Sequence, residues 1–234
     1  MIASLPMYAR PELAGPIARY WEAIQDHATA QNVTYDQTVI GVDAWRRPDL
    51  FLSQTCGAPY RDHLADQVQL VGTPDPGLPG CPPGYYQSVL IARDLITWGE
   101  ALTQQWAANE AGSQSGTYAP RLRAPARLPD PSWSGSHLMS IDMVANGQAD
   151  WAAIDAVTWA IADRLGQTHG LVVWDRTEPT PGLPYICAKA LDPLPLRDAI
   201  KVAIGSLDQA TRDVLMIHDL IDIPKTDYLA VPKP

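Results

Sequence analysis

The sequence is poor in basic residues, and it contains no long apolar run. Lysine and arginine together number 17 against 26 aspartates and glutamates, which gives a formal net charge of -9. This acidic balance argues against nucleic acids and anionic membrane surfaces as partners, because both attract basic patches. No apolar run approaches the roughly 20 residues that span a bilayer. A small anionic ligand is not excluded, since a local group of N–H donors can bind an anion against the overall field.

The sequence also lacks a recognisable export signal. Met1 leads directly into the strand-like residues 2–5 and then Pro6, without a basic and apolar leader. We therefore expect the chain to be cytoplasmic as written, or periplasmic if an export signal has been removed. The sequence does not decide between the two.

Familiar catalytic and metal-binding signatures are missing. There is no G-x-S-x-G nucleophile elbow, and the histidines at 27, 63, 137, 169 and 218 lack metal-ligand spacing. The one candidate for a nucleophile–base pair is His137 near Ser115 or Ser140. We expect no enzyme activity, no cofactor and no metal.

Cysteine is scarce, with three residues in the chain. Cys56 ends one expected strand, and Cys81 lies in the turn-rich loop after the next one. Neighbouring strand ends would allow a disulfide between them, which we favour slightly over three thiols. An odd number of cysteines also suits a reducing compartment. Cys187 lies in an apolar run and is expected to be a buried thiol.

What the chain does contain is a regular alternation of apolar segments. Its 234 residues, 46% of them hydrophobic, are enough for one large or two small domains. The periodicity predicts helices over 11–30, 117–123 and 151–165, and strands over 50–55 and 68–72, with proline-rich turns between elements. Strands that alternate with helices indicate α/β domains with mainly parallel sheets. Ligands then bind at the carboxyl ends of the strands.

The most informative segment covers residues 109–117, Asn-Glu-Ala-Gly-Ser-Gln-Ser-Gly-Thr. It places hydroxyls, an amide and glycines just before the helix expected over 117–123. A helix N-terminus offers unpaired N–H groups, and Gly116 allows the backbone to approach a ligand closely. The segment therefore predicts an oxyanion site, although an ordinary serine N-cap explains a short Ser/Gly run as well.

Further polar residues precede or begin other expected helices. Ser136 and His137 open one helix, and Asp155 and Trp159 are four residues apart, on one face of the helix expected over 151–165. Each has a structural alternative: Ser136 as an N-cap, Asp155 as a local cap or ion-pair partner, and Trp159 as a core residue. Their joint placement at strand ends and helix starts favours a binding site.

Residues 48–57, 109–116, 135–137 and 144–155 resemble the phosphate/phosphonate-type substrate-binding proteins of ABC transporters. The resemblance extends from the first strand to about Pro184. It implies the type 2 periplasmic-binding-protein fold, in which two α/β lobes are joined by two crossover strands and enclose a cleft. One lobe would contain 1–87 and 186–234, and the other 88–185. The implied function is capture of a small oxyanion by a monomer that works with an ABC permease.

The resemblance also implies a set of ligand-binding residues. Ser113, Gln114 and Ser115 would hold the oxyanion with His137 beside it, and Asp155 would meet an amine or hydroxyl at the other end of the ligand. The full set is Tyr8, Ser53, Gln54, Thr55, Ser113, Gln114, Ser115, Gly116, Ser136, His137, Asp155 and Trp159.

The sequence departs from the family pattern at one central position. Gln114 stands where the family carries a small hydroxyl residue, which implies an anion of different shape. Two alternatives stay open. One is a cytosolic enzyme or sensor of the same fold that acts on a small metabolite. The other is a pyrimidine- or thiamin-related binder that uses Tyr8, Trp45 and Trp159.

Overall fold

The protein forms two compact α/β units in a computed structural model that describes residues 1–30 and 32–234. The first unit contains 1–85 and 181–230, and the second contains 86–180 together with 231–234. The chain passes between units within β5 (Tyr85–Tyr86) and within β11 (Thr180–Pro181). These passages lie two and five residues before the boundaries expected from the sequence, and the last four residues belong to the second unit.

The first unit is built on a six-stranded mixed sheet with the order β13-β4-β12-β3-β1-β2. Strand β1 runs parallel to its neighbours β2 and β3, whereas β12 runs antiparallel to both β3 and β4, and β13 runs antiparallel to β4. The strands are β1 (Ile2–Ala3), β2 (Thr34–Tyr35), β3 (Leu50–Gln54), β4 (Val68–Asp75), β12 (Tyr185–Ala188) and β13 (Asp219–Ile221).

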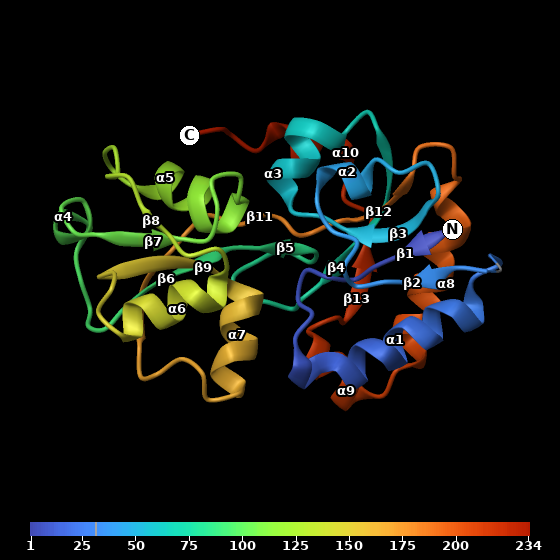
Figure 1. The fold of residues 1–234 in the computed structure, drawn as a ribbon, viewed down its shortest axis with the longest axis horizontal. Helices are drawn as coiled ribbons and strands as arrows, with labels where there is room; N and C mark the ends of the chain where they lie inside the picture. Colours follow the sequence, from blue (N-terminus) through green and yellow to red (C-terminus); the bar gives the residue numbers. More distant parts are fainter. Residues whose placement is uncertain (31) are drawn as a thin grey trace. The chain divides into compact units, whose positions relative to one another are not determined.

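Helices cover both faces of this sheet (Figure 1). One face carries α1 (Ala14–His27), α8 (Pro193–Ser206) and α9 (Gln209–Leu215); the other carries α2 (Val42–Trp45), α3 (Gly57–Pro59) and α10 (Lys225–Ala230). A 3₁₀ turn, Pro11–Leu13, leads into α1, and a π-helical turn, Tyr60–Leu64, follows α3. The apolar stripe predicted for the first helix is confirmed, since the residues that form it are all buried: Leu13, Ile17, Tyr20, Trp21 and Ile24.

The second unit contains a five-stranded sheet with the order β10-β6-β9-β7-β8. Here β7, β8 and β9 are parallel, while β6 is antiparallel to both of its neighbours. The strands are β6 (Ser88–Ala92), β7 (Trp106–Ala108), β8 (Ser132–Trp133), β9 (Trp151–Asp155) and β10 (Val172–Arg176). The helices are α4 (Trp98–Ala101), the π-helical turn Gln114–Tyr118, α5 (Ala119–Arg123), α6 (His137–Ala145) and α7 (Ala156–Arg164).

Tryptophans fill one side of this second sheet. Trp106 of β7 stacks on Trp151 of β9 with a centroid distance of 5.1 Å and an interplanar angle of 12°. Trp98 and Trp174 pack edge-on against Trp151. Both stacked rings are completely buried. This packing holds β7 and β9 in register, so the residues that follow the two strands have defined positions.

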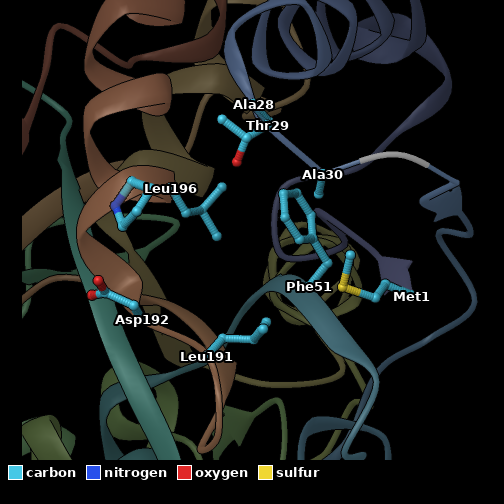
Figure 2. Close-up of a pocket in the computed structure, with 9 residues that line it drawn as sticks. Met1, Ala28, Thr29, Ala30, Phe51, Leu191, Asp192 and Leu196 are labelled. Atoms are coloured by element: carbon cyan, nitrogen blue, oxygen red, sulfur yellow. The ribbon is translucent and has the colours of Figure 1, made fainter.

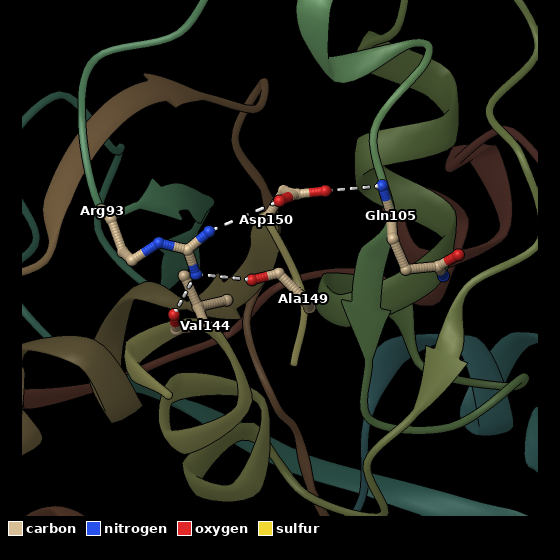
Figure 3. Close-up of polar contacts among 5 residues, drawn as sticks. All are labelled: Arg93, Gln105, Val144, Ala149 and Asp150. Carbon is tan, nitrogen blue, oxygen red and sulfur yellow. Dashed lines mark hydrogen bonds and ion pairs between the residues drawn. The ribbon is translucent and has the colours of Figure 1, made fainter. Parts of the chain in front are cut away.

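Hydrogen bonds and an ion pair of Arg93 connect the end of α6 with the residues just before β9 (Figure 3). Its Nη1 donates to the carbonyls of Val144 and Ala149 at 2.6 and 2.9 Å. Asp150 lies 3.4 Å from Nη2 and accepts from the backbone N–H of Gln105 at 3.0 Å. A cation at a helix C-terminus is favourable because it satisfies carbonyls that the helix leaves without partners. The network therefore sets the connection between α6 and β9.

Three expectations about local structure require correction. The predicted helix over 151–165 is wrong in its first part, because 151–155 form the strand β9 and the helix begins at Ala156. The helix predicted at Thr117 begins earlier, with the π-helical turn at Gln114. The sheets are mixed rather than mainly parallel. Strand β12 pairs antiparallel with β3 in the first unit, and β6 pairs antiparallel with β9 in the second.

The expected disulfide between Cys56 and Cys81 is not present in the described chain, where all three cysteines are thiols. The prediction assumed that the strands β3 and β4 are neighbours. Strand β12 lies between them instead. The ends of β3 and β4 are therefore two strand positions apart, about 9–10 Å, and not adjacent as the prediction required.

Candidate functional site

Several polar residues meet at one edge of the second sheet, where its three parallel strands end. Asn109 follows β7, Ser134 follows β8, and Asp155 ends β9. Strand β6 runs the other way, so it begins at this edge, and its first residue, Ser88, pairs with Asp155. The carboxyl edge of parallel strands is the usual ligand-binding edge of an α/β sheet. The sheet topology therefore brings together residues that are up to 67 positions apart.

Three helical segments also begin at this edge, each with a side chain that caps it. Ser113 accepts from the N–H of Gly116 at 3.0 Å, and Ser136 accepts from Met139 at 3.1 Å. Asp155 accepts from the N–H groups of the two residues 157 and 158 at 2.7 and 3.0 Å. The capping alternatives considered for Ser136 and Asp155 are thus both observed. Helix N-termini carry a partial positive charge, so their convergence favours a negatively charged group nearby.

The π-helical turn Gln114–Tyr118 is joined to α6 through Ser115. The hydroxyl of Ser115 lies 2.9 Å from Nε2 of His137, the first residue of α6. The carbonyl of Ser115 accepts a hydrogen bond from the hydroxyl of Ser88 at 2.8 Å. Two neighbouring elements therefore hold Ser115 in place. Such prior positioning of a hydroxyl lowers the entropic cost of using it to bind a ligand.

His137 is held in its neutral form. Enclosure away from water lowers the pKa of His137 from 6.5 to about 4, and the nearby backbone of Ala153 opposes this shift only in part. The residue as a whole is partly exposed, but its Nδ1 is sealed from solvent. At neutral pH the imidazole therefore acts as a polar, uncharged partner of Ser115.

Gly116 is required by the close approach of two side chains. A Cβ atom at this position would overlap Oδ1 of Asn109 and would lie 3.2 Å from Cε1 of His137. Any other residue would displace one of these groups. The sequence predicted that Gly116 lets the backbone approach a ligand closely, whereas the groups that approach it in the structure are side chains of the protein.

Two amide side chains in this segment carry buried atoms that make no hydrogen bond. Oδ1 of Asn109 is one of them, and both Oε1 and Nε2 of Gln114 are the others. Gln114 is only 2% exposed. Burying amide atoms without partners is costly, so these atoms are open positions for a ligand or a water molecule.

The residues predicted in the first unit lie at the carboxyl ends of β1 and β3, and three of them have internal partners. Ser53 is completely buried, and its hydroxyl is bonded to Ser4 at 2.8 Å and to Nε1 of Trp45 at 3.1 Å. The amide of Gln54 donates to the carbonyl of Leu183 at 3.1 Å, and the hydroxyl of Thr55 donates to the adjacent carbonyl of residue 56 at 3.3 Å. Their side chains therefore contribute to the shape of this strand end.

Described residues of the first unit line a small and a larger cavity. One, of about 30 Å³, is lined by Tyr8 and Gln54 together with the tyrosines Tyr20 and Tyr185. It lies at the carboxyl ends of β1 and β3, and its size suits a single water molecule. The other, of about 150 Å³, contains none of the predicted residues: its wall includes Phe51 near the start of β3 and Leu191 and Leu196 (Figure 2). That cavity lies at the opposite edge of the sheet from the one where ligands usually bind.

Ser115 and His137 are the candidate nucleophile–base pair named from the sequence. Ser115 and His137 have the separation of a nucleophile–base pair, 2.9 Å. A general base works best with a pKa near the operating pH, whereas the pKa of His137 is about 4. Among the described residues, no group of three His, Cys, Asp or Glu side chains is arranged to hold a metal ion. None of the described helices combines the length and the apolarity needed to cross a membrane.

Sequence reasoning missed two residues at this edge. Asn109 is the first residue of the segment 109–117, from which the anion site was predicted. Only the structure places its side-chain oxygen Oδ1 against Gly116. Ser88 lies in a buried strand and bonds to the backbone of Ser115. A serine at the start of an apolar strand was the available signal. Trp159, predicted as a site residue, lies partly exposed within α7.

Several solved structures share the fold of this chain. PhnD1 from Prochlorococcus marinus (MIT 9301), in complex with methylphosphonate, has a TM-score of 0.75 and 17% sequence identity, with 97% of this chain and 93% of that chain covered. A binding protein component of an ABC phosphonate transporter from Pseudomonas aeruginosa has a TM-score of 0.68, 14% identity and coverages of 94% and 80%. A Xanthomonas citri protein bound to ATP has a TM-score of 0.65, 14% identity and coverages of 97% and 92%. These likenesses define the fold, the two-lobed fold of periplasmic binding proteins.

The family follows from the sequence itself. The family model of phosphonate periplasmic substrate-binding proteins of ABC transporters matches residues 56–227, most of the chain. The chain belongs to this family, and the resemblance and fold class expected from the sequence are confirmed. No curated protein sequence matches the chain with significance.

Proposed function

We propose that this protein binds a small phosphonate-like oxyanion at the carboxyl edge of its second sheet and delivers it to an ABC permease. The main support is the hydrogen-bonded pair of Ser115 and His137 within a buried turn whose N-terminal cap is Ser113. Hydroxyls and helix N-termini supply the donors that a phosphonate oxygen accepts. Membership of a transport family supports delivery to a permease over catalysis.

Asp155 is proposed to contact an amino or hydroxyl group at the far end of the ligand. The support is its burial, 3% exposed, beside residues of the anion site. A carboxylate close to a bound anion is tolerated only if the ligand carries a cationic or donating end, since like charges repel. Asparagine in its place keeps a cap oxygen for α7, so an Asp155→Asn variant separates the two roles.

Isothermal titration calorimetry tests this assignment. The panel is methylphosphonate, 2-aminoethylphosphonate, phosphate, phosphite and sulfate. Ser115→Ala and Ser113→Ala are each expected to weaken binding by roughly 1–3 kcal/mol, because a buried anion loses a charge-assisted hydrogen bond or the turn that holds it. Thr103→Ala is the control, since this exposed hydroxyl, bonded to the carbonyl of residue 100, precedes β7 at the other edge of the sheet.

Each result has a defined meaning. Unchanged affinity in both serine variants would move the site elsewhere in the protein. Asp155→Asn is expected to reduce the preference for 2-aminoethylphosphonate over methylphosphonate and to leave binding of simple oxyanions intact. If this variant binds the whole panel as the parent does, Asp155 serves only to cap α7.

A further inference from the structure

Gln114 is a buried amide without any partner. In the part of the chain that the structure describes, it is the one buried side chain with two polar atoms lacking hydrogen bonds, Oε1 and Nε2. It is 2% exposed. A buried amide without partners disfavours the folded state, and an isosteric apolar side chain such as methionine would avoid that cost. The amide is therefore useful only in a state in which something else bonds to it.

The neighbouring polar groups do not fill this need. Ser113 accepts from the backbone N–H of Gly116, and Ser115 is bonded to His137. Asn109, against Gly116, has an unpartnered oxygen of its own. The segment thus has two side-chain amide oxygens that lack a donor, Oδ1 of Asn109 and Oε1 of Gln114. It also has one amide nitrogen that lacks an acceptor, Nε2 of Gln114.

This balance of donors and acceptors limits the ligand. A fully deprotonated phosphonate, a sulfate or a sulfonate has acceptors only, so it can bond to Nε2 of Gln114 but not to Oε1. A singly protonated phosphonate carries P=O and P–OH on adjacent oxygens. A primary amide can meet both at once, with its N–H donating to P=O and its C=O accepting from P–OH.

We propose that Gln114 makes this bidentate contact and selects a singly protonated oxyanion, a phosphonate, phosphite or phosphate monoanion, against sulfonates and sulfate. The proposal rests on the proposed function and names the ligand form that the site takes.

The decisive comparison is calorimetry of the unmodified protein with methylphosphonate and methanesulfonate at about pH 6. The two ligands have nearly the same shape, and near this pH the phosphonate monoanion and the sulfonate carry equal charge, but only the phosphonate carries an acidic proton. We expect methylphosphonate to bind tighter by a factor of about 100 or more, because a buried acceptor left unbonded rejects the analogue. Equal binding of the two ligands would overturn the proposal.

A second measurement uses Gln114→Met, which keeps the side-chain volume and removes both polar atoms. Its affinity for methylphosphonate is expected to fall about tenfold or more, with little change for methanesulfonate. Its melting temperature without ligand is expected to equal or exceed that of the parent, since the unpartnered atoms are gone. Gln104→Met is the matched control, because Gln104 has one unpartnered buried oxygen outside the turn.

The outcomes separate the two proposals. If the unmodified protein and Gln114→Met bind methylphosphonate equally well, the side-chain amide of Gln114 makes no hydrogen bond to the ligand. The inference about Gln114 is then wrong, while the proposed function stands. If the unmodified protein binds no oxyanion of the panel, the proposed function fails and this inference fails with it.

Discussion

Gly116→Ala is the sharpest test of how the turn is built. The new Cβ would overlap Oδ1 of Asn109 and would lie 3.0 Å from Cγ of the same residue and 3.2 Å from Cε1 of His137. His137 is held by its hydrogen bond to Ser115, and the side-chain amide of Asn109 would have to move to admit the new methyl group. Overpacking of this kind costs about 1–3 kcal/mol, which corresponds to a fall in melting temperature of roughly 2–12 °C for a protein of this size.

Gly112→Ala is the matched control for this change. It lies four residues earlier in the same segment, and a Cβ there would meet nothing within 4 Å. Thermal melting followed by fluorescence, together with calorimetry against methylphosphonate, reports both effects. We expect Gly116→Ala to lose stability and at least about tenfold in affinity, and Gly112→Ala to change neither.

A double variant tests the cause. Asn109→Ala removes the group that the new methyl overlaps, so stability is expected to recover in part when it is combined with Gly116→Ala. The interaction energy from the double-mutant cycle should be favourable by about 0.5–3 kcal/mol. A Gly116→Ala protein that melts and binds like the parent would refute the described packing of the turn.

Three further outcomes are expected. Arg93→Lys should lower the free energy of unfolding, measured with urea, by about 1–3 kcal/mol, because a lysine ammonium lacks the planar fork by which the guanidinium contacts the carbonyls of Val144 and Ala149 and the carboxylate of Asp150 together; an unchanged midpoint would contradict this role. For His137, the pKa in the folded protein, about 4, lies below the value of 6.5 in the unfolded chain. The unfolded chain therefore binds more protons between these two pH values, and the free energy of unfolding falls as the pH drops from about 6.5 to 4. Urea unfolding of His137→Gln should lack this part of the pH dependence, which amounts to at most about 3 kcal/mol; equal slopes would contradict the burial of the ring. Burial raises the pKa of the Cys187 thiol to about 12, so Cys187 should react with a thiol reagent only after the protein unfolds. The unfolded, unreduced protein should show three reactive thiols, and a count of one would indicate a Cys56–Cys81 disulfide instead.

Local signals in the sequence predicted some of the backbone features at the candidate site. Ser136 precedes a helix and caps it, as its residue type and position predicted. The Ser/Gly segment lies at the start of a helical turn, and Gly116 permits a close approach. These features depend on backbone geometry within a few residues, and short-range sequence patterns report such geometry well.

Asp155 shows where local patterns failed. Residues 151–155 have the composition of a helix, and the spacing of Asp155 and Trp159 fitted one helical face. Pairing with β6 and β7 makes the segment a strand in which every residue is buried. A short apolar run has no periodicity that separates a buried strand from a buried helix, so its neighbours in space decide.

The sequence by itself determined the family and the α/β class, because motifs and hydrophobic periods are properties of consecutive residues. Only the tertiary structure decided which strands are neighbours. The insertion of β12 between β3 and β4 separates Cys56 from Cys81, and the contact of Ser115 with His137 joins residues 22 positions apart. Such pairings depend on how whole elements bury their surfaces against one another, and no local segment carries that information.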